Sequence, residues 1–528
     1  MLTTRAFAEP GRWAMGVSAD DDRARDVTSD LVRDCGFTPV SLVQVEKVTT
    51  SIRQKETMPS DAASAKATED AVGQKTDPGG GPGLKLAALA AGFVMATVDT
   101  TVVNIAGTKI RTLLHLNFSE LTWVIDGYVL TFASLLLLAG SLANRFGAKK
   151  IYLQGMVVFV AASAACAVAS KGLALITARV IQGAGAALFM PASLTLLTNS
   201  FPDPKLRTRM VGLWTAIVST FTALGPVIGG VLVGTLGWRS IFVFNLPIGV
   251  VGIFLTRRYI AAIPAQRVRP RILGNALGVL GLVALSFTLI EGPSFGWSSV
   301  PVLLSGAAAV VFLVALVVQQ RRSSAPIVPL DLFRESRFTA ANLVGFLINF
   351  GLMGGIFMLG LFLQNARGAS PFLAGVQMLP MMAGPLVGNL TFARYSHRWG
   401  VRRPLIAALS LAGVASAALL GISDSTPYWM LAAAVGIANF GIGVSAPAMT
   451  FVLMESAGAE HANIASSMLN TNRQFGGLVG VAVIGIALAH PDNWYVGARS
   501  SFLITAVCYG AAALLTLKYV SAAGRRTV

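Results

Sequence analysis

Two aspartates and one arginine lie inside long apolar runs of this 528-residue chain, where a charge is costly. Asp99 follows Ala96-Thr-Val, Asp126 follows Trp123-Val-Ile, and Arg179 lies in a run that continues to Gly185. A charged side chain at the centre of a bilayer costs about 2.5–3.5 kcal/mol on insertion scales. Such groups carry a proton, pair with an opposite charge or bind a polar substrate, so these three residues are the first candidates for a function.

Asp99 is the leading candidate for a proton carrier. Burial disfavours the charged form of a carboxyl group, so a buried acid can take up and release a proton near neutral pH. The alternative is that the neighbouring Thr and Asn side chains satisfy Asp99. Arg179 keeps its charge and must face a cavity, a counter-charge or the membrane interface, with Asp99 and Asp126 as candidate partners. Asp126 is either a contact for substrate or proton, or the counter-ion of Arg179.

The composition indicates a membrane protein with many spans. Hydrophobic residues make up 54% of the chain and charged residues 12%, against about 25% charged in soluble domains. Three cysteines and four histidines are scattered, which predicts neither a disulfide framework nor a metal site. Apolar runs predict an all-α fold of about fourteen transmembrane helices. These helices are expected to begin near Leu84, Leu121, Ile151, Gly172, Arg207, Arg239, Ile272, Val300, Phe338, Pro371, Pro404, Pro427, Ala462 and Ser501.

The net charge of +17 follows the membrane topology and does not indicate nucleic-acid binding. Basic residues gather in alternate loops, such as the one with Arg145, Lys149 and Lys150 and the one with Arg257 and Arg258. This positive-inside pattern predicts a multi-pass protein of the plasma membrane with both termini in the cytoplasm.

A repeat divides the membrane part into two halves. Asn144-Arg-Phe-Gly-Ala-Lys-Lys150 recurs as His397-Arg-Trp-Gly-Val-Arg-Arg403, each between the second and third helix of its half. The repeat predicts parallel six-helix bundles with the substrate site between them. The expected divisions are a polar cytoplasmic tail (1–83), the first bundle (84–258), a two-helix insertion with its loops (259–336), the second bundle (337–520) and a short cytoplasmic tail (521–528).

The N-terminal segment has a different character. Residues 1–83 are polar and end in Asp77-Pro-Gly-Gly-Gly-Pro-Gly83, which is typical of a flexible linker. Short elements are possible over Arg23–Cys35 (helix) and Val40–Val45 (strand). The segment is expected to be largely disordered, or to result from a start upstream of the native one, with Met58 as an alternative initiator.

Two glycine-containing stretches are typical of moving parts. In Gly140-Ser-Leu-Ala-Asn-Arg-Phe-Gly-Ala-Lys-Lys150, small residues allow two helices to approach closely, and Arg145 can hold a contact that breaks on switching. In Leu224-Gly-Pro-Val-Ile-Gly-Gly230, the proline removes a backbone hydrogen bond and the glycines permit tight packing. The switch is therefore predicted to involve Gly140, Asn144, Arg145, Gly147, Lys149, Gly225, Pro226, Gly229 and Gly230.

These stretches, together with Val98-Asp-Thr-Thr-Val-Val-Asn-Ile-Ala106 and Ala178–Gly185, resemble the major facilitator superfamily over about residues 84–520. Within it, the chain is similar to the fourteen-span drug:proton antiporters (EmrB/QacA type). The resemblance implies that Asp99 is a protonation site, that Arg179 lies near the proton path, and that the stretch from Leu224 marks an antiporter. Two departures are Gly107, where the family usually has proline, and Asn144, where an aspartate would complete a latch with Arg145.

The sequence therefore predicts proton-driven efflux of a hydrophobic or cationic drug by a transporter, with no cofactor and as a monomer. Alternatives are a dedicated exporter or importer of one metabolite or lipid, and a non-transporting receptor or scaffold. There is no phosphate-binding loop for ATP, and no hydrolase or metal-ligand spacing for an enzyme. Polar residues within the spans are candidates to line the substrate cavity: Asn104, Gln182, Asn349, Gln377, Asn439 and Arg473.

Overall fold

A computed structural model describes residues 3–9, 12–18, 38–41, 81–263, 272–323, 330–489 and 493–520. It divides the chain into two compact units, Met1–Thr76 and Asp77–Val528. The first unit contains a three-stranded sheet of β1 (Thr3–Glu9), β2 (Arg12–Ser18) and β3 (Thr38–Ser41). Strand β1 pairs antiparallel with β2, and β2 pairs parallel with β3.

This sheet differs from the expectation for residues 1–83. The strand expected at Val40–Val45 overlaps the end of β3, whereas the helix expected at Arg23–Cys35 lies outside the described residues. The all-α class applies to the second unit, in which every described element is a helix.

The first half of the membrane unit follows the predicted order of spans. Its helices are α4 (Pro82–Leu113), α5 (Phe118–Phe146), α6 (Ala148–Val168), α7 (Gly172–Asn199), α8 (Pro204–Leu236) and the continuous pair α9 (Ser240–Val243) and α10 (Asn245–Tyr259). The insertion consists of α11 (Ile272–Phe295) and α12 (Val300–Arg322).

The second half repeats this pattern. Its elements are η1 (Leu330–Arg334), α13 (Ser336–Asn365), α14 (Pro371–Gln377), α15 (Leu379–Trp399), α16 (Arg402–Ala417), η2 (Ala418–Gly421), α17 (Tyr428–Leu488) and α18 (Trp494–Tyr519). Two spans are joined in α17 across a kink at Gly458. Thirteen helices of the described part are long and apolar enough to cross a membrane, or fourteen if the bent α5 counts as one span. The fold-class prediction is confirmed.

Helix ends lie where the local sequence places them. Asn117 accepts a hydrogen bond from the backbone N–H of Glu120, whose carboxylate accepts one in return, so α5 begins with a capping box. Asp203 caps α8, and Pro204 is its first residue. Gly147, with a φ of +93°, separates α5 from α6 in a conformation that other residues rarely adopt.

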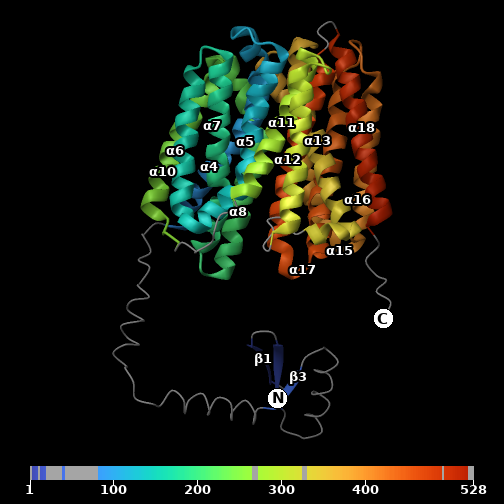
Figure 1. Ribbon diagram of the computed structural model, residues 1–528. Coiled ribbons are helices and arrows are strands. Elements are labelled where there is room, and N and C mark those ends of the chain that lie inside the picture. Colours follow the sequence, from blue (N-terminus) through green and yellow to red (C-terminus); the bar gives the residue numbers. More distant parts are fainter. Residues whose placement is uncertain are drawn as a thin grey trace. The chain divides into compact units, whose positions relative to one another are not determined.

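The two halves stand side by side with the insertion between them (Figure 1). Helix α11 packs against α5 and α17, one from each half. The Glu291 carboxylate of α11 accepts hydrogen bonds from Ser119 (2.7 Å) and from the Trp123 indole (2.8 Å), both of α5. Glu291 therefore connects the insertion to the first bundle.

Close contacts between the halves gather at one end of the bundle. The loops with Lys149, Arg257 and Arg402 define the basic end. Towards the opposite end, Gln364 of α13 donates to the carbonyl oxygen of Ile105 of α4 at 2.9 Å. Helices α8 and α14 also meet in this part of the bundle. The basic ends of α8 and α17 lie apart in Figure 1, so this conformation is joined at the end away from the basic loops.

Candidate functional site

Asp99 and Arg179 form a buried ion pair in the first half. Asp99 lies on α4 with 2% of its surface exposed, and Arg179 lies on α7 with 1% exposed. Arg179 Nη1 donates to Asp99 Oδ2. Of the alternatives for Arg179 (a cavity, a counter-charge or the membrane interface), the structure shows the counter-charge, which is Asp99.

Further donors surround the Asp99 carboxylate. Gln182 Nε2 donates to Asp99 Oδ1 at 3.0 Å, and Asn245 Nδ2 donates to the same oxygen at 3.1 Å. Gln182 also donates to the Ser163 hydroxyl at 2.9 Å and accepts from Arg179 at 2.6 Å through its Oε1. Four helices therefore contribute to one polar cluster, and both carboxylate oxygens of Asp99 have donors.

The guanidinium of Arg179 is equally well surrounded. Its Nε donates to the carbonyl oxygen of Val124 on α5 at 3.0 Å. The guanidinium carbon lies 4.4 Å from the ring centroid of Tyr128 and 5.8 Å from that of Phe242. Rings at this range stabilise a desolvated cation. Each charge therefore has a partner and each partner is held by neighbours, as a buried ion pair requires.

Asp126 is buried without such partners. It is 0% exposed, and neither of its carboxylate oxygens has a hydrogen-bond partner among the described residues. Thr122, one turn earlier on α5, lies opposite Gly485 of α17, where a Cβ built on the glycine would be 3.5 Å from the Thr122 hydroxyl. Residues four apart share a helix face. Asp126 therefore lies on the face of α5 that meets the second half, and it is not the counter-ion of Arg179.

The glycines of α8 are points of close helix contact. A Cβ on Gly225 would lie 2.0 Å from the Thr101 hydroxyl of α4, and one on Gly229 would lie 2.9 Å from Val102. A Cβ on Gly230 would lie 2.6 Å from the carbonyl oxygen of Pro371 in the second half. The stretch after Leu224 thus holds α8 against its own bundle and against the other half.

Pro226 takes part in the same contact between halves. Its carbonyl oxygen would lie 2.3 Å from a Cβ on Gly375 of α14. Glycine is needed on both sides of this α8–α14 contact, which allows the two backbones to approach.

The loop between α5 and α6 differs in part from the expectation. Asn144 and Arg145 are exposed, and the Arg145 guanidinium stacks on the neighbouring Phe146 ring at 5.1 Å. Lys149 Nζ donates to the carbonyl oxygen of Arg257 at the end of α10. A Cβ on Gly140 would meet no atom within 4 Å, so the predicted close helix approach at Gly140 is absent from this conformation. The reason is that the halves make their close contacts at the other end.

The six predicted cavity residues do not converge on one site. Gln182 belongs to the ion-pair cluster. Asn104 and Asn349 donate to carbonyl oxygens of their own helices, at Thr100 and Gly345. Gln377 ends α14, with its side-chain oxygen unpartnered among the described residues, and Arg473 lies half-buried on α17. Only Asn439 lines the cavity described next.

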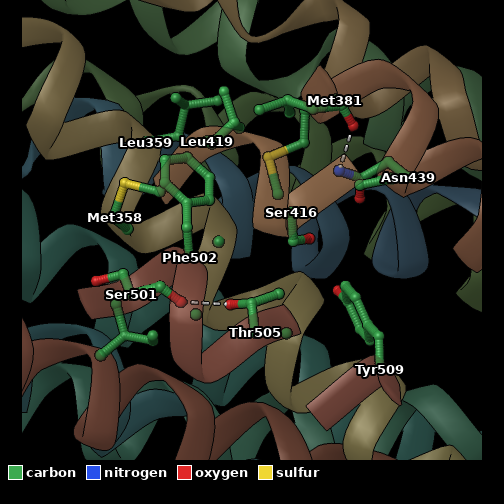
Figure 2. A pocket seen from close by; sticks show the side chains of 16 residues that line it. Met358, Leu359, Met381, Ser416, Leu419, Asn439, Ser501, Phe502, Thr505 and Tyr509 are labelled. Carbon is green, nitrogen blue, oxygen red and sulfur yellow. Dashed lines mark hydrogen bonds between the residues drawn. The ribbon is translucent and has the colours of Figure 1, made fainter. Parts of the chain in front are cut away.

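A cavity of about 30 Å³ lies inside the second half (Figure 2). Glycines of α13, two methionines and residues of α15 to α18 form its wall. Figure 2 shows Met358, Met381 and Phe502 around the same space as Asn439 and Thr505. The full lining consists of Gly351, Gly354, Gly355, Met358, Leu359, Met381, Ser416, Leu419, Val435, Ala438, Asn439, Ile484, Ser501, Phe502, Thr505 and Tyr509.

Sequence reasoning missed several residues of the cluster. Tyr128, Ser163 and Asn245 were not singled out, because tyrosine, serine and asparagine are common in membrane helices. The signal available was that a buried carboxylate requires donors, and Asn245 is one of the few side chains of α10 that can donate.

The fold and this buried charge cluster define a class: a membrane transporter built of two repeated helical bundles. A family model for the Major Facilitator Superfamily matches residues 88–481. The chain therefore belongs to the Major Facilitator Superfamily, and it is a transporter and not an enzyme. This confirms the family resemblance read from the sequence.

Several relatives are named for drug resistance. The chain is 52% identical to a methylenomycin A resistance protein of Streptomyces coelicolor, over 84% of this chain and 94% of that protein. It is 47% identical to a protein of the same name from Bacillus subtilis, over 83% and 94%. It is 33% identical to the tetracenomycin C resistance and export protein of Streptomyces glaucescens, over 79% and 78%. These relatives confirm the prediction that the protein is a drug-efflux transporter.

Solved structures agree on the fold. A peptide transporter, POT, in complex with sulfate has a TM-score of 0.62 at 15% identity, over 83% of this chain and 92% of that chain. The human organic anion transporter MFSD10 (TETRAN) has a TM-score of 0.56 at 15% identity, over 83% and 100%. At this identity the likeness concerns the fold alone.

Proposed function

We propose that this protein exports a small-molecule drug from the cytoplasm in exchange for protons, by alternating access between its two halves. Methylenomycin A, or a compound of its kind, is the first candidate substrate, because two relatives named for resistance to it are 52% and 47% identical over most of both chains. The drug-resistance names of the relatives support export over uptake.

The orientation follows from the charges. We place the protein in the plasma membrane with its basic end and both chain termini on the cytoplasmic side. The conformation described here, joined at the opposite end, is then open to the cytoplasm and ready to receive a drug. A hydrophobic or cationic drug and a monomeric state remain predictions from the sequence.

The proton is assigned to Asp126, on the observation that its fully buried carboxylate lacks any partner among the described residues. An isolated carboxylate in an apolar interior costs several kcal/mol, so this side chain is stable here in its protonated form. Its place on the face of α5 toward α17 matters, because switching changes that contact and admits water. Opening on the far side would let Asp126 exchange its proton there, which couples protonation to the conformation.

Asp99 is then the anchor of the first half and not its proton carrier. Protonating Asp99 would leave the Arg179 charge without its counter-ion, at a cost comparable to breaking a buried pair, about 3–5 kcal/mol. This proposal differs from the sequence-based prediction for Asp99, and for Asp126 it takes one of the two roles that the sequence left open.

The test is proton and drug movement in everted membrane vesicles that hold an imposed proton gradient. Addition of methylenomycin A is expected to dissipate the gradient with the wild-type protein. Asp126→Asn should abolish this dissipation and retain drug–drug exchange across the membrane, because exchange needs no net proton movement. The matched control is Glu120→Gln, a partly exposed acid at the start of the same helix, where glutamine can keep the capping bond, and it should behave as wild type.

Three results would overturn separate parts of the proposal. Gradient dissipation that persists in Asp126→Asn would remove Asp126 from the proton path. A wild-type protein that moves neither methylenomycin A nor protons on its addition would exclude this drug as a substrate. Loss of exchange as well as coupling in Asp126→Asn would show a folding or binding defect instead of a coupling role.

A further inference from the structure

The repeated loop relates positions of the two halves. Gly147 and Gly400 both adopt a positive φ, +93° and +67°, at the same place in the repeat. The same interval along the chain separates Gly155 of α6 from Ala408 of α16. Positions in the second and third helices of the two halves can therefore be matched by this interval.

The packing of the fourth helix of each half allows its positions to be matched as well. A Cβ on Gly185 of α7 would lie 2.9 Å from the carbonyl oxygen of Gly155, and a Cβ on Gly441 of α17 would lie 2.4 Å from that of Ala408. Gly185 and Gly441 are therefore equivalent, which relates α7 to the first span of α17.

The first and last helices of each half complete the correspondence. A Cβ on Gly360 of α13 would lie 3.1 Å from the backbone oxygen of Asn104 of α4, so the first helices cross there. With Asn104 and Gly360 taken as equivalent, Met95 of α4 is equivalent to Gly351 of α13. Met95 lies against Gly249 of α10, and Gly351 lies against Tyr509 of α18, so Gly249 and Tyr509 are equivalent as well.

The ion-pair cluster of the first half and the cavity of the second half occupy equivalent places. The cluster also includes Cys166, whose thiol donates to the Gln182 oxygen at 3.8 Å. The counterparts of the residues that contribute side chains to the cluster all line the cavity. The pairs are Asp99 with Gly355, Tyr128 with Met381, Ser163 with Ser416, Cys166 with Leu419, Arg179 with Val435, Gln182 with Ala438, Phe242 with Phe502 and Asn245 with Thr505.

At three of these positions the second half has a smaller side chain, with valine in place of arginine, alanine in place of glutamine and glycine in place of aspartate, and this leaves space unfilled. At another position Leu419 is larger than Cys166. Protein interiors are normally packed without such voids, and a void forfeits contacts. The sixteen lining residues include no aspartate, glutamate, lysine, arginine or histidine.

Most polar groups of the cavity offer free acceptors, and the Tyr509 hydroxyl is a further polar group that can also donate. Asn439 is 5% exposed; its amide nitrogen donates to the carbonyl oxygen of Val435, and its oxygen has no partner among the described residues. The hydroxyls of Ser416, Ser501 and Thr505 each donate to a carbonyl oxygen of their own helix, which leaves their lone pairs free. A buried acceptor without a donor costs about 1–3 kcal/mol.

We propose that this cavity is a binding subsite for the hydrogen-bond-donating end of an uncharged molecule, such as a hydroxyl or an undissociated acid group. An anion or a cation finds no counter-charge among the lining residues, so both are disfavoured. This rests on the proposed export function, since the occupant is taken to be part of the exported drug.

The size of the cavity fits one end of a drug and not the whole molecule. Its 30 Å³ is well below the roughly 150 Å³ of an engineered cavity that binds benzene. Met358 and Met381 form part of the wall, and methionine side chains adapt readily to a new shape. The donor group would reach Asn439 while the rest of the molecule stays outside.

Direct binding is measured on the full-length protein in lipid nanodiscs by fluorine NMR. The probes are 4-fluorophenol, a neutral donor, and 4-fluoroanisole, which has the same ring without the donor. Saturable binding of 4-fluorophenol is expected for wild type, weakened about three- to tenfold in Asn439→Leu because one hydrogen bond is lost. The anisole should show no such difference.

Matched variants separate the cavity from general effects. Gly355→Val places its side chain against Met381, where a Cβ would lie 3.0 Å from the methionine terminal carbon, and should abolish binding. Thr505→Val should weaken it. Thr516→Val changes a buried threonine on the same helix with the same type of backbone bond outside the cavity, and should bind as wild type.

Each failure has a distinct meaning. No saturable binding of 4-fluorophenol to wild type, as expected if only water occupies the space, overturns the subsite. Methylenomycin A export with unchanged KM in both Asn439→Leu and Gly355→Val also overturns it, while the export function stands. Binding that depends on Asn439, in a protein that does not move methylenomycin A, supports the cavity and refutes that choice of drug.

Discussion

Replacing Arg179 by methionine should destabilise the protein strongly, because it leaves the Asp99 charge buried. Gln182 and Asn245 would still donate to the carboxylate, but no cation would remain beside it. Breaking a buried ion pair from one side costs about 3–5 kcal/mol. That free energy corresponds to about two to nearly four orders of magnitude in the unfolding equilibrium.

Replacing Asp99 by asparagine should have a similar effect for the converse reason. The Arg179 guanidinium would keep its bonds to the Val124 and Gln182 oxygens but lose its counter-ion. The double variant Asp99→Asn with Arg179→Met contains neither charge. It should be more stable than the sum of the single effects predicts by about 2 kcal/mol or more, within the range known for contacting residues.

The measurement is reversible unfolding by sodium dodecyl sulfate in mixed micelles, followed by circular dichroism for wild type, both single variants and the double variant. Asp126→Asn is the control, because the Asp126 carboxylate has no partner to lose, and it should stay within about 1 kcal/mol of wild type. Single effects that add within about 0.5 kcal/mol would refute the coupled ion pair. A large loss in Asp126→Asn would refute its neutral, unpartnered state.

Three further changes test the other parts of the molecule. Gly230→Ala should slow export and populate the form separated at the α8–α14 contact, because its Cβ would lie 2.6 Å from the Pro371 carbonyl oxygen; cross-linking across α8 and α14 measures this. Gly147→Leu should lower stability by about 1–3 kcal/mol because of its positive φ, measured by the same micelle unfolding. Glu291→Gln should loosen α11 from α5 by about 1–2 kcal/mol, seen as a change in Trp123 fluorescence.

The sequence predicts the membrane fold well because each span has its own signal. A run of about twenty apolar residues must form a helix in a bilayer, since no water is present to satisfy its backbone. The starts expected near Gly172, Ile272, Val300 and Pro371 coincide with helix starts in the structure. The repeat between Asn144 and Lys150 also predicts the two halves, since both copies have a glycine with positive φ at the same point.

The site was harder to predict from the sequence, because its geometry depends on contacts between residues that are far apart in the chain. A buried acid signals function at both Asp99 and Asp126, but their difference lies in what surrounds them. Only the positions of α7 and α10 reveal that Asp99 is fully partnered while Asp126 is not. The cavity gives no signal in sequence, since glycine, valine and alanine at Gly355, Val435 and Ala438 are ordinary residues of a membrane helix.

The two halves therefore share a fold but divide their chemistry. In the first half, a complete ion pair joins α4 to α7 and makes that bundle costly to deform. In the second half, the equivalent space is hollow, uncharged and walled by adaptable methionines. Asp126 lies on the face between them, and in the proposed mechanism its protonation responds to their relative position. A rigid half, an adaptable half and an ionisable group at their boundary are the parts that exchange of a drug for a proton requires.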